Sequence, residues 1–294
     1  MGTGTSVPKG NLSPGLHVVA TPIGNLGDMT DRARAILSQA DLIACEDTRV
    51  SLTLLRRFNI TTPCAAYHEH NAERMRPRLM AMLAEGKRVA LISDAGTPLV
   101  SDPGYKLARD VIEAGHRLHA APGASAVLVA LVLSGLPSDR FFFAGFLDAK
   151  RLARRRDLET LAVVPASLVF FESAQRLADS LADMAEMLGD RPAAVARELT
   201  KLHEEVRRDR LSVLAQHYRQ AGPPKGEIVV VVGPPLPKPA PDAADLDAAL
   251  ATALAGMSVR DAAAEVAASL GLNRRTVYAR ALELARDDDE GEGP

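Results

Sequence analysis

The stretch Leu16–Asp28, LHVVATPIGNLGD, decides the fold class. A short β-rich run ends in a glycine loop, and a helix-like pattern follows from Met29 to Gln39. The order recurs where Asp41–Cys45 precedes a helical stretch near Arg49–Arg57, where Lys87–Ser93 precedes the loop Asp94–Pro98, and where His116–Ala120 precedes Pro122–Ser125 and a helix from Ala126 to Leu133. Alternating strands and helices predict an α/β fold with a mostly parallel sheet covered on both faces. Such sheets bind ligands at the carboxyl ends of their strands.

A second α/β domain is predicted to follow the first, because strand-like runs reappear at 140–146, 167–172, 193–198 and 226–232. A proline-rich segment then separates an alanine-rich helical tail, in which a break at Gly271 precedes a new helix from Arg274. This tail is typical of a helix-turn-helix, and a plain helical hairpin is the alternative. The predicted organisation is a flexible N-terminus (1–14), an N-terminal α/β domain (15–136), a C-terminal α/β domain (137–233), a linker (234–241), a small helical module (242–286) and a disordered acidic tail (287–294).

Composition narrows the class of protein. The 294 residues carry a formal net charge of -2, so nothing global indicates a nucleic-acid partner, and an RNA surface would have to be a local basic patch. Two cysteines, Cys45 and Cys64, do not make a disulfide framework. Met1–Pro14 lacks the apolar core of a signal peptide, and no apolar run approaches membrane-spanning length. We therefore expect a soluble, cytoplasmic protein.

The loops after the predicted strands carry the chemistry. Gly24 and Gly27 are too few for a dinucleotide-binding fingerprint, but Asp47 lies where a ribose-binding acid would fall, so an NAD enzyme stays open on this fragment. Gly96 permits close approach of the backbone to a ligand and Asp94 can accept hydrogen bonds, although a tight turn would need the same residues. Ser125 is placed at a helix N-terminus, which suits an anion, and simple capping is the alternative.

Taken together, these loops resemble one known family. The resemblance rests on TPIGNL (21–26), CEDTR (45–49), HEHN (68–71), SDAGTP (93–98), PGAS (122–125), GLPSDRF (135–141), GFL (145–147), FES (171–173), ARELTK (196–201) and KGE (225–227). They are similar to the tetrapyrrole-methylase-like superfamily and, within it, to the ribosomal RNA small-subunit methyltransferase I group. The resemblance covers about residues 15–233, and it displaces the NAD interpretation.

The resemblance implies a function and a site. Members of the group have two α/β domains around a cleft for S-adenosylmethionine, pair as homodimers, and methylate the ribose 2′-oxygen of a decoding-region cytidine in 16S rRNA. The implied cofactor-binding residues are Pro22, Ile23, Gly24, Asp94, Ala95, Gly96, Thr97, Pro122, Ser125, Phe171, Glu172 and Gly226. A methyltransferase acting on a tetrapyrrole or another small molecule and a nonenzymatic RNA-binding factor are the competing hypotheses.

A proton acceptor would assist methyl transfer, because a neutral 2′-hydroxyl is a poor nucleophile. The catalytic candidates are Glu46, Asp47 and Lys201, with His68, His70 and Glu172 as weaker ones. The charges of Glu46–Arg49 could equally form a salt-bridged helix start. His68 and His70 have no third ligand nearby in the sequence and so give little indication of a metal site. We therefore expect none. Contact with RNA suits them better, and Tyr67 beside them could stack on a base.

The expected RNA surface is local. Its candidate residues are Arg49, His68, His70, Arg151, Arg154, Arg155, Arg156, Arg274 and Arg275, and Arg207, Arg208 and Arg210 add positive charge. Arginines suit phosphates, and a solvated helix face is the alternative for such runs. Phe141–Phe143 is predicted to pack in the core, because adjacent strand residues point to opposite faces. The substrate would be 16S rRNA within the small ribosomal subunit.

Overall fold

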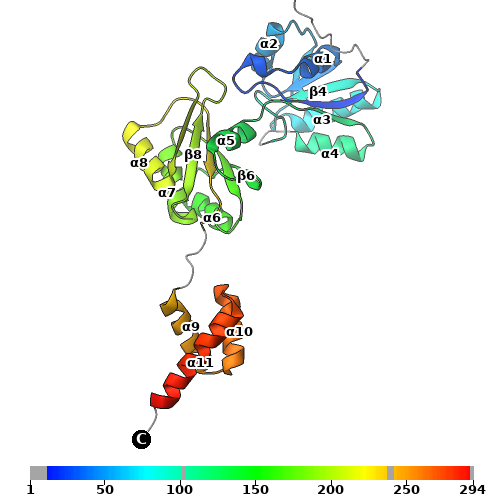
Figure 1. The fold of residues 1–294 in the computed structure, drawn as a ribbon. Coiled ribbons are helices and arrows are strands. Elements are labelled where there is room, and N and C mark those ends of the chain that lie inside the picture. The colour runs from blue at the N-terminus through cyan, green and yellow to red at the C-terminus, as the bar shows by residue number, and fades with distance from the viewer. Residues whose placement is uncertain (1–11, 101–103, 237–241, 292–294) are drawn as a thin grey trace, which may run out of the picture. The chain divides into compact units, whose positions relative to one another are not determined.

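A computed structural model describes residues 12–100, 104–236 and 242–291 of the chain, with side chains to 285. The chain divides into two compact units, 1–235 and 236–294, and each is described by itself (Figure 1). The first eleven residues, residues 101–103, the linker positions 237–241 and the last three residues lie outside the described residues.

The first sheet of unit 1 is entirely parallel, as the alternating pattern predicts. Its strands lie in the order β3-β2-β4-β1-β5. They are β1 (Gly15–Val19), β2 (Leu42–Cys45), β3 (Cys64–Ala66), β4 (Arg88–Ile92) and β5 (Leu118–Ala121). The sequence pattern did not indicate β3. Central strands β1 and β4 bring the loops after Val19 and Ile92 to one edge.

Helices cover both faces of this sheet. They are α1 (Asp31–Gln39), α2 (Thr48–Arg57), α3 (Ala72–Ala84) and α4 (Tyr105–Glu113), and the short 3-10 helix η1 (Leu26–Asp28), which has no buried residue, precedes α1. Leu37 of α1 and Leu55 of α2 pack with Ile43 on one face. Leu79 of α3 and Leu107 of α4 pack on the other face. The prediction that helices cover both faces of the sheet is therefore confirmed. With both faces covered, the ends of the strands remain open to a ligand.

The second sheet is mixed, with the order β6-β7-β10-β8-β9, and only β6 and β7 run parallel. Its elements are α5 (Ala126–Ser134), β6 (Phe141–Phe146), α6 (Arg151–Leu161), β7 (Ser167–Glu172), α7 (Leu177–Leu188), β8 (Pro192–Arg197), β9 (Glu205–Arg210), α8 (Leu211–Ala221) and β10 (Ile228–Val232). Helix α5 covers one face and α6, α7 and α8 the other.

One expectation about this half is wrong for two of its three residues. Phe141 and Phe142 are 42% and 44% exposed on edge strand β6, and only Phe143 packs against the core. Arg207, Arg208 and Arg210 lie on a second edge strand, β9, so the alternative of a solvated helix face does not apply to them.

Unit 2 consists of α9 (Ala243–Leu254), α10 (Val259–Leu270) and α11 (Arg274–Gly291) (Figure 1). Asp242 forms a capping box at the start of α9, and Ser258 accepts from a backbone N–H at the start of α10. Gly271 ends α10 in the left-handed region. Helix α11 continues to Gly291, so the acidic segment expected to be disordered begins inside a helix. Within the described chain, no helix has the length and apolarity to cross a membrane.

Candidate functional site

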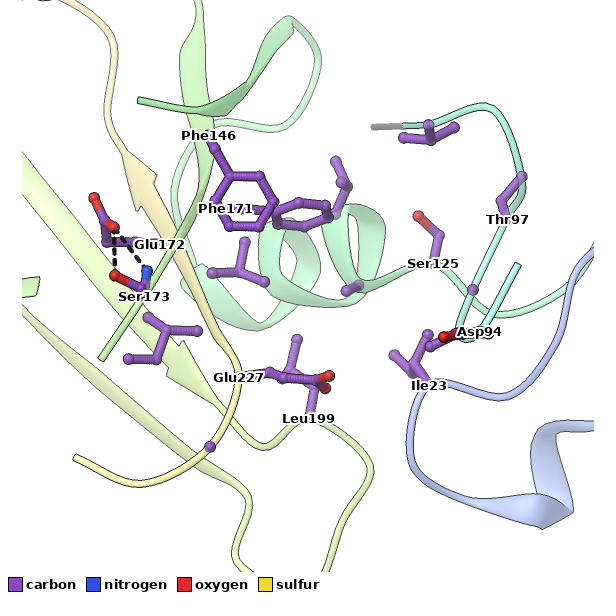
Figure 2. Close-up of a pocket in the computed structure, with 18 of the residues that line it drawn as sticks. Ile23, Asp94, Thr97, Ser125, Phe146, Phe171, Glu172, Ser173, Leu199 and Glu227 are labelled. Carbon is purple, nitrogen blue, oxygen red and sulfur yellow. Dashed lines mark hydrogen bonds between the residues drawn. The ribbon is translucent and has the colours of Figure 1, made fainter. Parts of the chain in front are cut away.

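A cavity of about 490 Å³ in unit 1 is lined by loops at the strand ends of the first sheet and by β6, β7 and β10 of the second. Figure 2 shows the rings of Phe146 and Phe171 together on one side, and Ile23, Asp94, Thr97 and Ser125 on the other. Nine of the twelve predicted cofactor residues line it: Ile23, Asp94, Ala95, Gly96, Thr97, Ser125, Phe171, Glu172 and Gly226. Pro22, Gly24 and Pro122 do not.

Three loops of the first half interlock at the cavity. Thr21 and Gly96 exchange two backbone hydrogen bonds, of 2.8 and 3.1 Å. Gly96 has φ +81, a conformation that favours glycine. The Thr97 hydroxyl donates to the Ala124 carbonyl at 3.2 Å, which ties in the third loop. These bonds hold the loop backbones in place before any ligand arrives.

Ser125 occupies the N-cap position of α5, yet its side chain makes no capping hydrogen bond. Capping therefore does not account for this serine. Ser125, Ala126 and Val127 all line the cavity, so the N-terminus of α5 faces it. Free N–H groups and the positive end of the helix dipole suit a carboxylate there.

The charged residues that line the cavity are all acidic: Glu46, Asp94, Glu172 and Glu227. Asp94 accepts a hydrogen bond from the backbone N–H of Asp47 at 3.1 Å, which fixes one of its oxygens. Burial, and then the charge of Asp94, raise the pKa of Glu46 above its ordinary value. Glu46 is thus a carboxylate at the cavity wall whose affinity for a proton is raised.

Asp47, the neighbouring candidate, does not line the cavity. It caps α2 by accepting from the backbone N–H of Arg49 at 2.8 Å, and it pairs with the Arg49 guanidinium at 2.6 Å. The side-chain hydrogen bond from Arg49 lowers the pKa of Asp47 to about 2. Asp47 and Arg49 therefore form the salt-bridged helix start that was the alternative to a catalytic role. A carboxylate with so low a pKa is also a weak base.

Lys201 lies beside the cavity and not in its wall. Its ammonium donates to Glu198 at 2.8 Å and to Glu227 at 2.9 Å. Burial lowers the pKa of Lys201, but these hydrogen bonds outweigh it and the net shift is upward. Lys201 is therefore protonated and unsuited to accept a proton. A Cβ at Gly24 would overlap the Lys201 side chain, so the first glycine loop packs directly on this lysine.

Glu172 is among the residues that line the cavity, but its side chain is buried. Phe171 faces the cavity and Glu172 comes next on the same strand, so their side chains leave opposite faces of the sheet. The Glu172 side chain is fully buried, and its Oε1 accepts from the backbone N–H of Ser173 at 2.7 Å (Figure 2) and from Arg176 at 2.9 Å. One oxygen of this carboxylate, Oε1, is therefore engaged within the protein.

The basic stretch on α6 is mostly paired. Arg154 is 4% exposed, and its guanidinium donates to Asp183 at 2.9 and 2.6 Å, so the expectation that it contacts RNA is wrong. Arg151 also pairs with Asp183, and Arg155 with Glu186. Buried carboxylates recruit arginines because an unpaired buried charge is costly. Arg156 is exposed.

Among the residues that the structure describes, no group of three or more His, Cys, Asp or Glu side chains could hold a metal ion. The rings of His68 and His70 lie 6.0 Å apart, edge to face. Tyr67 is 2% exposed, so the expected stacking on a base is wrong. In unit 2, Arg274 and Arg275 are exposed at the start of α11, whereas Arg280 pairs with Asp247 at 2.7 Å.

Several lining residues were missed from the sequence, among them Val100, Phe146, Ser173 and Leu199. Phe146, Ser173 and Leu199 fall inside the motifs that carry the resemblance, so the signal was present. What the motifs did not give is which side chain of each points inward.

Known proteins match this chain along its whole length. Residues 15–215 match the family model described as Tetrapyrrole (Corrin/Porphyrin) Methylases, and residues 240–285 match the RsmI C-terminal HTH domain. Ribosomal RNA small subunit methyltransferase I of Mesorhizobium japonicum is 53% identical over 98% of both chains. The protein of the same name from Erythrobacter litoralis is 54% identical over 93% of this chain and 96% of its own.

A solved structure, the cobalamin biosynthetic enzyme cobalt precorrin-4 methyltransferase CbiF, shares the fold with a TM-score of 0.56 at 19% identity, over 74% of this chain and 94% of its own. The domain matches and the full-length relatives lead to one conclusion. The chain belongs to the tetrapyrrole methylase family and, within it, to the ribosomal RNA small subunit methyltransferase I family.

Proposed function

We propose that this protein transfers a methyl group from S-adenosylmethionine to the ribose 2′-oxygen of a decoding-region cytidine in 16S rRNA. The observation that carries the substrate is the identity, above 50% over nearly the whole chain, with relatives named for methylation of small-subunit ribosomal RNA. A tetrapyrrole substrate is disfavoured because the tetrapyrrole enzyme shares only the fold, and a fold does not fix a function.

The cavity fits S-adenosylmethionine by its chemistry. The cofactor carries a sulfonium and an ammonium group, and the carboxylates of Glu46, Asp94 and Glu227 give the wall a negative charge. Its carboxylate suits the N-terminus of α5 at Ser125. Its adenine suits the apolar wall that contains Phe146 and Phe171.

Bound S-adenosylmethionine supplies an electrophilic methyl group. The protein's share is then to orient the ribose oxygen toward it and to take the proton that the hydroxyl gives up. Glu46 suits the second task because it lines the cavity and burial raises its pKa above the ordinary value. Lys201 is the cation that holds Glu227 and Glu198 at the rim. Asp47 positions the start of α2.

RNA contacts are proposed at exposed basic residues: Arg49, His70, Arg156, Arg274 and Arg275, with His68 beside Glu46. RNA contact is also proposed for Arg151 and Arg155 of α6, although both pair with carboxylates of α7. The substrate would be the small ribosomal subunit in the cytoplasm. A homodimer would have apolar surface available at Phe141 and Phe142 on edge strand β6.

The test is transfer of labelled methyl from S-adenosylmethionine to small subunits from a strain that lacks this protein. Parallel reactions contain free 16S rRNA and uroporphyrinogen. We expect label in the RNA and none in the tetrapyrrole. Label in the tetrapyrrole alone would overturn the proposed substrate, and absence of cofactor binding would overturn the enzymatic proposal itself.

A further inference from the structure

Arg176 bonds to two separate strand ends at once. It occupies the N-cap position of α7, and its guanidinium reaches three acceptors. Nε donates to the Ser173 hydroxyl at 2.9 Å, one terminal nitrogen donates to the Leu147 carbonyl at 3.3 Å, and the other pairs with Glu172 at 2.9 Å. A guanidinium presents its donors on three separate nitrogens in a rigid fork, whereas the three donors of an ammonium sit on a single nitrogen.

These acceptors adjoin the cavity wall. Leu147 follows Phe146 at the end of β6, and Glu172 and Ser173 follow Phe171 at the end of β7. Phe146, Phe171 and Ser173 line the cavity, and the two phenyl rings lie 5.4 Å apart. Arg176 therefore joins, from behind, the two strand ends that carry the aromatic wall.

The ion pair between Arg176 and Glu172 neutralises a buried charge. The Glu172 side chain has no exposure, and within the described residues its Oε2 has no hydrogen-bond partner. Arg176 is the cation that pairs with this carboxylate there. Without the guanidinium, a buried charge would lose its counter-ion, and the β7 end would shift toward water to solvate it. Such a shift would move Phe171 and Ser173 with it.

We propose that Arg176 is a positioning residue for cofactor binding, acting through Glu172, Ser173 and Leu147 on the aromatic wall. The inference rests on the proposed binding of S-adenosylmethionine in this cavity. It goes beyond that proposal because Arg176 does not line the cavity itself.

The experiment compares full-length variants by calorimetric titration with S-adenosylmethionine, by steady-state methyl transfer and by melting temperature. Arg176→Gln is expected to raise Kd and KM for the cofactor about tenfold, which corresponds to loss of one charge-assisted hydrogen bond, with kcat little changed. Arg176→Lys is expected to fall between, because an ammonium cannot reach all three acceptors.

Arg191→Gln is the matched control. Arg191 is a buried arginine that donates to two backbone carbonyls, those of Leu188 and Ala162, and none of these residues lines the cavity. It is expected to lower the melting temperature without changing cofactor Kd. The double variant Glu172→Gln/Arg176→Gln is expected to bind more tightly than Arg176→Gln alone, because it removes the unpaired charge.

Unchanged Kd in both Arg176 variants would overturn the inference, as would an equal loss of affinity in Arg191→Gln. A double variant no better than Arg176→Gln would overturn the route through Glu172. If Arg176→Gln does not fold, Arg176→Lys and the double variant give the answer. Failure of the wild-type protein to bind the cofactor would instead contradict the proposed function.

Discussion

At the scale of single residues, Glu46 and Asp47 show how neighbouring carboxylates acquire different roles. The pKa of Glu46 is raised by burial and by the charge of Asp94, whereas the pKa of Asp47 is lowered to about 2 by its hydrogen bond to Arg49. Only Glu46 lines the cavity. A carboxylate with a raised pKa accepts a proton more effectively than a strongly acidic one.

Replacing Glu46 with Gln is expected to lower kcat by about 100-fold, the usual size of a lost general base. Cofactor Kd should change far less, because the amide keeps the shape of the side chain. Asp47→Asn is the paired variant, and it should retain most activity because Asn also caps helices well. Equal losses of kcat in both variants would contradict the distinction drawn between the two residues.

The pH dependence of kcat follows from the same carboxyl. Glu46 must be ionised to accept a proton, so kcat is expected to fall as pH drops through its raised pKa. Asp94→Asn removes a negative charge that raises this pKa. The acidic limb of the kcat profile should therefore move to lower pH in Asp94→Asn, and a limb that stays in place would remove Glu46 as the titrating group.

At the scale of elements, sequence pattern predicted the strands with strong apolar runs and missed two others. β3 has only three residues, Cys64–Ala66, so it leaves no alternation to detect. β9 reads EVRRDR, which is typical of an exposed helix face. Both are edge strands, where charge and shortness protect against pairing with other chains.

The sequence predicted which loops form the candidate site, because the carboxyl ends of parallel strands meet at one edge of a sheet. Which side chain serves the cavity depends on contacts distant in sequence. Ion pairs fix the side chains of three of the predicted site residues: Lys201 pairs with Glu227, Arg154 with Asp183, and Glu172 with Arg176. Local spacing carries no information on such pairs.

A substitution at Gly226 tests the role of the loop that precedes β10 and lines the cavity. Gly226 has φ +100, and a Cβ there would overlap the Glu198 carboxylate that holds Lys201. Gly226→Ala is expected to cost about 1–3 kcal/mol of stability from backbone strain and to raise cofactor Kd. Chemical denaturation and calorimetric titration measure the two effects.

Gly86→Ala provides the comparison, since Gly86 has φ +73 but a Cβ there would meet nothing within 4 Å. It should lose stability from strain alone and keep the wild-type cofactor Kd. An equal rise of Kd in both variants would show that strain, and not displacement of Glu198, governs binding.

At the scale of the whole molecule, unit 1 and unit 2 have separate cores. Leu250, Val266 and Val277 pack within unit 2, and the cavity lies wholly within unit 1. A chain ending at Pro235 is therefore expected to fold and to bind S-adenosylmethionine as the full chain does. Its affinity for small subunits should fall, because Arg274 and Arg275 are removed.

Circular dichroism, cofactor titration and sedimentation with small subunits at several salt concentrations check this expectation. The variant Arg274→Ala/Arg275→Ala in the full chain separates loss of these phosphate contacts from loss of the module. Wild-type affinity for small subunits in the truncated chain would show that unit 2 takes no part in substrate binding.

The most direct measurement of the central claim is the position of the transferred methyl group. Small subunits from a strain lacking the protein would be labelled by the purified enzyme, digested with nuclease and analysed by mass spectrometry of the nucleosides. The account predicts one labelled nucleoside, a cytidine carrying the methyl on its ribose, and much less of it with Glu46→Gln. Label on a base, or on the ribose of another nucleoside, would contradict it.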